Sequence, residues 1–253
     1  MELAILLAAA FLAGFIDAVV GGGGLIQIPA LFSALPGFSP ATLLGTNKLA
    51  GIWGTFAAAV NYSRRVEVRW NAALPAAIAA FALAFAGAYA VTAIDGSLVR
   101  KLLPFVLIFV ALYTFKRKDF GQVNTPLLSG SHERAVAIGS GGLIGFYDGF
   151  FGPGTGSFLV FIFVRIFGLD FISASAAAKI VNVACNLAAL AWFWPSGHVL
   201  WQLGLGMACF NIAGSLLGSR LAIARGSAFV RRVFLFVVCL LILKTGYDAI
   251  KLF

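Results

Sequence analysis

Long apolar runs separated by short polar segments leave few folds open to this chain. Eight runs approach or reach the roughly 20 residues that a helix needs to cross a membrane, and they cover 3–20, 41–62, 71–94, 98–115, 134–151, 172–195, 199–224 and 229–251. Charged residues make up only 11% of the chain, against about 25% in soluble domains. The sequence therefore predicts an all-α, polytopic membrane protein in which residues 1–253 form one domain within the lipid bilayer.

The positions of the basic residues favour a membrane over a nucleic acid as the partner. The chain carries 18 Lys and Arg against 9 Asp and Glu, which gives a net charge of +9. Many of these cations lie between apolar runs, in the segments 64–69, 100–101, 116–118 and 220–232. Lys and Arg concentrate in this way in the cytoplasmic loops of membrane proteins, so we expect no nucleic-acid partner.

Two similar stretches place an acidic residue and several glycines inside apolar runs. Residues 14–24 read Gly-Phe-Ile-Asp-Ala-Val-Val-Gly-Gly-Gly-Gly, and residues 145–156 read Gly-Phe-Tyr-Asp-Gly-Phe-Phe-Gly-Pro-Gly-Thr-Gly. A carboxylate at the bilayer centre costs about 2.5–3.5 kcal/mol on insertion scales. Two interpretations of Asp17 and Asp148 stay open: a proton relay or lysine counter-ion, and a helix-end residue bonded to the amides of the glycine turn.

These stretches belong to an internal duplication with a constant offset of 131 residues. Matching pairs include Gly14/Gly145, Asp17/Asp148, Gly21/Gly152, Lys48/Lys179, Trp70/Trp201 and Arg100/Arg231. Asp, Lys, Trp and Arg are scarce in this chain, so their coincidence at one offset indicates two homologous repeats. We assign 1–115 to the first repeat, 116–133 to a loop and 134–253 to the second repeat. Each should hold about four long helices and a short re-entrant or half-helix, at 25–35 and 157–168, after its glycine-rich break.

Loop charges predict that the two repeats are inserted in opposite orientations. The loop 63–70 contains three arginines and one glutamate, whereas its counterpart 194–201 contains no Lys or Arg. Conversely, Asp95 is the only charge in its loop, and the matching segment contains Arg225. Inverted repeats of this kind are a common plan of secondary transporters.

Lys48 and Lys179 lie several residues inside long apolar runs. One interpretation is that each side chain snorkels along its own helix toward the interface. The other is a polar stripe that faces a cavity or another helix, because Asn182 and Asn186 follow Lys179 at spacings of three and seven residues. Further polar candidates are Thr46 and Asn47 beside Lys48, and more weakly Gln27, Asn211 and Tyr147.

The glycine clusters predict broken helices. No Gly-Lys-Ser/Thr follows them, which disfavours nucleotide binding. Glycines can allow close helix packing, or they can leave half-helix N-termini directed at a central site. Exposed amides and the positive end of the helix dipole favour anions there, with Gly23, Gly154 and Thr155 as candidate contacts.

Metal, cofactor and enzymatic chemistry are not expected. The three cysteines lie inside apolar runs, both histidines lie in loops, and no pair has metal-ligand spacing. The apolar runs contain no nucleophile–base pair of the kind that covalent catalysis requires.

Four segments together resemble the sulfite exporter TauE/SafE family. They are Gly14-Phe-Ile-Asp-Ala-Val-Val-Gly-Gly-Gly-Gly, Gly45-Thr-Asn-Lys-Leu-Ala, Gly149-Phe-Phe-Gly-Pro-Gly-Thr-Gly and Ala178-Lys-Ile-Val-Asn. The resemblance covers essentially the full chain and implies a multi-pass carrier of small sulfur-containing anions, such as sulfite or organosulfonates, in the bacterial inner (cytoplasmic) membrane. One departure is that Gly22 and Gly24 stand where the second half has Pro153 and Thr155.

Together these features predict a secondary transporter that moves a small oxyanion by alternating access. The predicted substrate contacts are Lys48, Lys179, Asn47, Thr46, Asn182, Asn186, Gly23, Gly154 and Thr155. Asp17 and Asp148 would hold the lysines or carry protons. A channel or a carrier for another small anion, such as formate or thiosulfate, is the alternative, and a homo-oligomer is compatible with the sequence.

Overall fold

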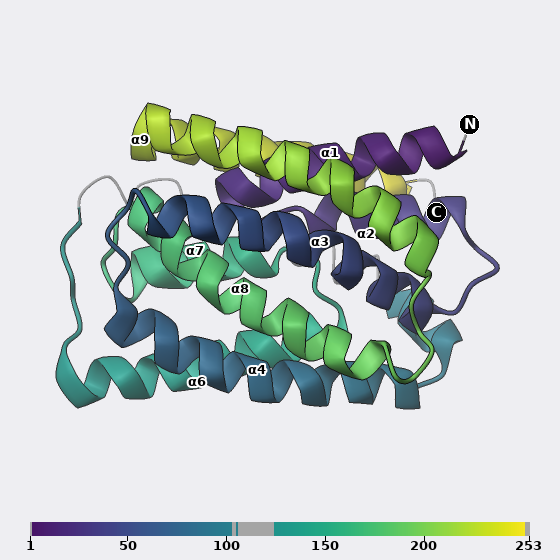
Figure 1. The fold of residues 1–253 in the computed structure, drawn as a ribbon, viewed down its shortest axis with the longest axis horizontal. Helices are drawn as coiled ribbons and strands as arrows, with labels where there is room; N and C mark the ends of the chain where they lie inside the picture. The colour runs from purple at the N-terminus through teal and green to yellow at the C-terminus, as the bar shows by residue number, and fades with distance from the viewer. Residues whose placement is uncertain (1, 103–104, 106–123, 251–253) are drawn as a thin grey trace.

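The structure is a computed structural model that describes residues 2–102, 105 and 124–250 (Figure 1). The described part is helical and contains no strand, which confirms the predicted all-α class. Most of the predicted span 98–115 and the first part of the loop 116–133, residues 116–123, lie outside the described residues. The elements are α1 (Glu2–Val20), α2 (Gly24–Ala34), α3 (Pro40–Ser63), α4 (Trp70–Ala93), α6 (Gly130–Phe150), α7 (Thr155–Arg165), α8 (Phe171–Phe193) and α9 (Trp201–Ile250).

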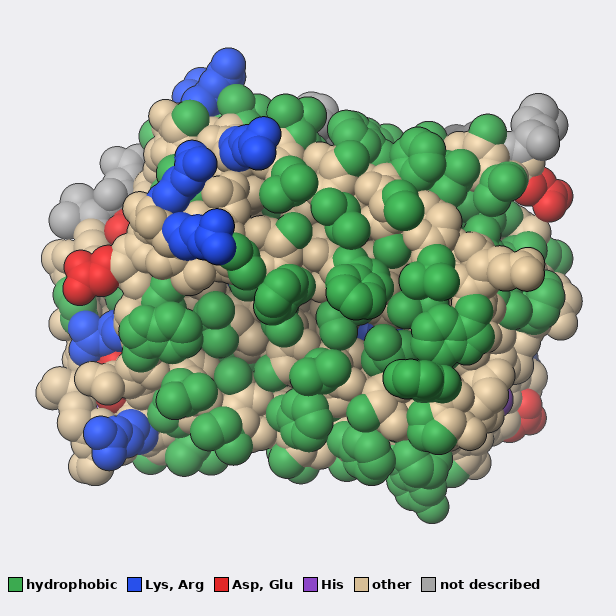
Figure 2. All heavy atoms as spheres, in the orientation of Figure 1, with side chains coloured by type: hydrophobic (Ala, Val, Ile, Leu, Met, Phe, Trp, Pro, Cys, Tyr) green, Lys and Arg blue, Asp and Glu red, His purple; other side chains and the backbone are tan. Residues whose placement is uncertain are grey.

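Four of the described helices are long and apolar enough to cross a membrane: α1, α4, α8 and the part of α9 from Trp201 to Val230. Large apolar side chains cover much of the face in Figure 2, and Lys and Arg gather toward one end. Helices α3 and α6, also predicted as full spans, have 24 and 21 residues. Their glycines and polar residues make them less apolar, and they are not among these four.

The two predicted runs at the C-terminal end are continuous in the structure except at one residue. Gly226 interrupts α9 with φ 74° and ψ −176°, a non-helical conformation. Only glycine adopts a positive φ of this kind without strain. The break falls between the predicted runs 199–224 and 229–251.

The helices form three layers in Figure 1, with α1 and α9 along one side and α4 and α6 along the other. Helices α3 and α8 cross between these pairs, and the short α2 and α7 lie in the interior. The helix contacts are matched between the halves: α1 packs on α9 as α6 packs on α4, and α3 packs on α9 as α8 packs on α4.

Small residues let α6 touch the backbone of α4. Gly141, Gly145 and Gly149 lie one turn apart on α6 and face Ala76, Ala80 and Ala84 on α4. A methyl group added at Gly145 would lie 2.5 Å from the Ala80 Cα atom, and one at Gly149 would lie 1.9 Å from the Ala84 carbonyl oxygen. Such small-residue contacts drive helix association in membranes, where no hydrophobic effect acts between helices.

The loop between α3 and α4 is joined to the start of α6. Arg69 forms an ion pair with Glu133 and donates a hydrogen bond of 2.8 Å to the Leu128 carbonyl oxygen. The Glu133 hydrogen bond keeps the pKa of Arg69 above its usual value. Glu133 was assigned to the polar loop, but it lies buried in the first turn of α6, which begins at Gly130 rather than at 134.

We expect the substitutions Gly145→Ala and Gly149→Ala to destabilise the protein by about 1–3 kcal/mol each, because overpacking separates α4 from α6. The measurement is the melting temperature of the detergent-purified protein. Gly139→Ala is the matched control, since a methyl group there meets no atom within 4 Å. Equal melting temperatures for all three variants would contradict this account of the packing.

Candidate functional site

Two ion pairs connect the two halves of the chain. Lys48 on α3 pairs with Asp148 on α6, and Lys179 on α8 pairs with Asp17 on α1 at 2.9 Å. Each lysine thus contacts the aspartate of the other glycine-containing stretch. The side chains of Lys48, Asp148 and Lys179 are at most 3% exposed, and that of Asp17 is 14% exposed. The snorkelling interpretation of the lysines is wrong, because both ammonium groups end inside the helix bundle.

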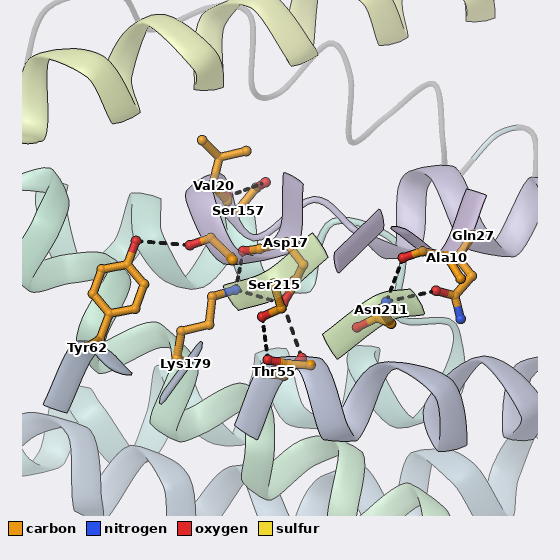
Figure 3. Close-up of polar contacts among 12 residues, drawn as sticks. Ala10, Asp17, Val20, Gln27, Thr55, Tyr62, Ser157, Lys179, Asn211 and Ser215 are labelled. Atoms are coloured by element: carbon orange, nitrogen blue, oxygen red, sulfur yellow. Dashed lines mark hydrogen bonds and ion pairs between the residues drawn. The ribbon is translucent and has the colours of Figure 1, made fainter. Parts of the chain in front are cut away.

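The carboxylates bind lysine and hydroxyl groups rather than the amides of the glycine turns. Asp17 accepts a hydrogen bond of 3.1 Å from the Thr55 hydroxyl as well as the contact from Lys179 (Figure 3). Lys179 also donates to the carbonyl oxygen of Asp17. This geometry corresponds to the counter-ion interpretation of the two aspartates.

The glycine breaks end α1 and α6 and start two short helices. Gly21 and Gly152 have φ values of 80° and 85°, in the left-handed region that favours glycine. Helices α2 and α7 then begin within a few residues. The two breaks contact each other, because Ser157 donates from its amide to the Gly21 carbonyl oxygen and from its hydroxyl to the Val20 carbonyl oxygen, both at 3.0 Å.

Both breaks line one small cavity of about 40 Å³. This is larger than the roughly 10–15 Å³ that one water molecule needs. Every lining residue is either polar or a glycine: Asp17, Gly21, Gly23, Gly24, Gln27, Asn47, Lys48, Gly51, Thr55, Asp148, Gly152, Thr155, Gly156, Asn182, Asn186 and Asn211. The cavity therefore offers hydrogen bonds and charge, and no apolar residue other than glycine lines it.

Two amides on α8 face this cavity without a partner. Asn182 and Asn186 are only 6% and 7% exposed, and within the described chain neither side chain has a hydrogen bond. Buried polar groups almost always have partners, whether protein or ordered water. Their free amides can therefore bind water or a small polar ligand.

Eight of the predicted site residues line the cavity: Asp17, Gly23, Asn47, Lys48, Asp148, Thr155, Asn182 and Asn186. Three do not. Lys179 contacts Asp17 from outside the lining, and Gly154 is not a lining residue. Thr46 points away from the cavity: it accepts a hydrogen bond from the Leu200 amide and donates one to the Thr42 carbonyl oxygen. Thr46 thus fixes the loop before α9.

Gln27 and Asn211, the weaker candidates, also line the cavity. Asn211 on α9 donates at 3.1 Å to both the Ala10 carbonyl oxygen and the Gln27 side chain, and so links α1, α2 and α9 (Figure 3). Tyr147 instead braces the second break, because its hydroxyl donates at 2.6 Å to the Pro153 carbonyl oxygen. The sequence signal for Asn211 was its isolation as a polar residue within an apolar run.

The two ion pairs cancel, so the site is neutral when all four groups are ionised. The ammonium group of Lys48 and the carboxamides of Gln27, Asn47, Asn182 and Asn186 can donate to a small oxyanion. In the described residues, no three His, Cys, Asp or Glu side chains converge as metal ligands. The chemistry available here is reversible binding of a small polar ion.

Apolar helices around a polar, glycine-broken centre are typical of a multi-pass helical membrane protein. The chain belongs to the sulfite exporter TauE/SafE family, whose family model matches residues 6–245. It is therefore a membrane transporter of that family, as the resemblance of its sequence motifs predicted.

Three relatives illustrate this membership. "Probable membrane transporter protein ORF9" of Sinorhizobium sp is 39% identical, over 97% of this chain and 93% of that protein. "Probable membrane transporter protein YfcA" of Escherichia coli (strain K12) is 35% identical, over 98% and 90%. A "Probable membrane transporter protein" of Haemophilus influenzae is 35% identical, over 97% and 95%. No solved structure matches the chain.

Replacing Lys179 by methionine should destabilise the protein by about 3–5 kcal/mol, because it leaves the Asp17 carboxylate without its buried partner. The double variant Lys179→Met/Asp17→Asn removes both charges and should regain most of that loss. Melting temperatures in detergent measure the difference, with Lys101→Met at an exposed lysine as the control. A double variant no more stable than the single one would show that the ion pair is not what holds α1 to α8.

Proposed function

We propose that the protein is a secondary transporter of a small anion, bound at the cavity beside Lys48 and moved by alternating access. The observation that carries this proposal is that Asn182 and Asn186 line the same cavity as the Lys48 ammonium group and make no side-chain hydrogen bond within the described chain. A cation and free N–H donors in a low-dielectric site favour an oxygen-rich anion. The family's exporter name supports efflux as the direction of transport.

The substrate class follows from the lining. No apolar residue other than glycine lines the cavity, so an organosulfonate's carbon tail would displace ordered water and gain contact only with the carbon atoms of polar residues and glycines. Sulfite is therefore favoured over the larger organosulfonates. Formate and thiosulfate are the next candidates, because they too lack an apolar tail.

Alternating access requires two halves that rock about a shared centre. The 131-residue offset, the matched helix contacts and the two crossed ion pairs support an inverted two-fold arrangement of the repeats. The site would then lie near that two-fold axis, with the two glycine breaks on either side of it. We place this transporter in the bacterial inner membrane, as its family membership suggests.

The test is anion flux into proteoliposomes that contain the purified protein. We expect saturable sulfite transport, faster than that of thiosulfate, formate, taurine and sulfoacetate. Lys48→Gln should reduce sulfite flux roughly 10-fold to 100-fold, since a hydrogen bond to a charged group contributes about 1.5–3 kcal/mol. Lys101→Gln is the matched control.

Two outcomes would contradict the proposal. Flux that does not saturate and never accumulates against a gradient would identify a channel instead. Equal flux in wild type and Lys48→Gln would remove Lys48 from the binding site.

A further inference from the structure

We infer that the two ion pairs have different tasks: Lys48–Asp148 exchanges its carboxylate for the transported anion with uptake of a proton, whereas Lys179–Asp17 is a fixed brace. This inference rests on the proposed function and assigns its anion site and its proton site. The four residues occupy equivalent positions in the two repeats, so the difference must come from their surroundings.

Lys179 has no free path to the cavity. Its ammonium group donates twice to Asp17, to the carboxylate at 2.9 Å and to the carbonyl oxygen, and its side chain is 1% exposed. The Thr55 hydroxyl, on a different helix, donates to the same carboxylate oxygen at 3.1 Å. Figure 3 shows Lys179 and Thr55 pointing at Asp17 from separate helices. An anion would have to displace Asp17 before it reached Lys179.

Lys48 is the cation that an anion can meet. It lines the cavity, and within the described chain its ammonium group has one acceptor, Asp148. An ammonium group has three donors, so two N–H bonds stay available. Gly152 leaves room beside this group, because a methyl group there would lie 3.1 Å from the Lys48 Nζ atom.

One substitution between the repeats accounts for the asymmetry. Thr55 on α3 bonds Asp17, whereas its equivalent on α8, 131 residues later, is Asn186. The Asn186 side chain lines the cavity and makes no bond to Asp148 in the described structure. Asp17 is therefore pinned by two helices, and Asp148 is held by Lys48 alone.

The exchange is balanced in charge and protons. Hydrogensulfite, the monovalent form of sulfite, takes an N–H donor of Lys48, and the Lys48–Asp148 hydrogen bond breaks. Because a buried carboxylate without a partner is strongly unfavourable, Asp148 binds one proton as the anion arrives. The site gains one anion and one proton, keeps its net charge, and returns both on release, and nothing is oxidised or reduced.

Few other titratable groups face Asp148. Lys48 approaches from α3 and the Cys185 thiol from α8, and Tyr147 is its neighbour on α6. Helix α4 packs on α6 through alanines, which do not titrate. On the other side of the cavity, Asp17 is a lining residue and Lys179 lies behind it. Asp148 is thus the group that can take up a proton when Lys48 changes its partner.

The experiment compares Asp148→Asn with Asp17→Asn in proteoliposomes, using radiolabelled sulfite. Asparagine mimics the protonated aspartate, so Asp148→Asn should bind sulfite roughly tenfold tighter at alkaline pH, where wild type is mostly in the paired state. Sulfite–sulfite exchange should persist in this variant, and the pH dependence of its binding should fall to that of the hydrogensulfite fraction alone. Accumulation driven by a pH gradient should be lost.

Asp17→Asn should behave in the opposite way. Its melting temperature should fall by several degrees, and the flux that the folded protein retains should still be driven by the pH gradient. The inference is overturned if Asp148→Asn still accumulates sulfite along a pH gradient, or if Asp17→Asn loses accumulation with an unchanged melting temperature.

A double variant covers the case in which Asp148→Asn does not fold. Lys48→Gln/Asp148→Asn has no uncompensated buried charge, and we expect it to fold without binding sulfite. Sulfite binding by this folded variant would overturn the assignment of Lys48. If wild-type protein moves no anion above the level of empty liposomes, the proposed function fails, before any variant is compared.

Discussion

A buried charge in an apolar environment needs a partner, and this requirement organises the centre of the molecule. Two lysines and two aspartates lie within the helix bundle, and each of the four is paired across the sequence halves. Removal of one partner leaves an uncompensated charge that is far more unfavourable than the loss of the pair itself. The pairs therefore join α3 to α6 and α1 to α8, and the four helices cannot separate independently.

Glycine supplies the second constraint, because it brings backbones close enough for those short side-chain contacts. Gly145 and Gly149 allow α6 to rest on the backbone of α4, and Gly14 allows α1 to rest on α9. Gly21 and Gly156 bring the two helix breaks into contact at the cavity. The same residue type thus permits close packing in the outer helix pairs and broken helices in the interior. Both interpretations of the glycine clusters apply, each at its own positions.

The lengths of the apolar runs were sufficient to predict most of the described helices, including the two short ones, because run length limits where a helix can lie in a membrane. The start of α6 was predicted too late, since Glu133 is polar in sequence but buried by its pair with Arg69. The charges in the sequence do not show that Glu133 pairs with Arg69, 64 residues earlier in the chain.

The site was predicted in part. The stripe of Lys179, Asn182 and Asn186 correctly placed both amides at the cavity, yet the flexible Lys179 stem ends behind Asp17. Thr46 failed for a geometric reason: two residues from Lys48 on a helix correspond to roughly 200° of rotation, so the two side chains face opposite sides. Which lysine pairs with which aspartate depends on how α3 and α8 cross, and helical spacing within one segment carries no information about that crossing.

The neutrality of the site also explains why a transporter would keep its cations paired while it waits for a ligand. An isolated ammonium group in the cavity would hold any anion, and its own burial would be unfavourable. A paired one binds only when the anion offers at least as good a partner and the displaced carboxylate is neutralised. In the proposed mechanism, specificity would arise from the competition between Asp148 and the substrate for Lys48, rather than from the shape of the cavity alone. The free amides of Asn182 and Asn186 would favour the substrate in that competition. They can donate to a ligand in the cavity, whereas Asp148 has Lys48 as its one partner in the described structure.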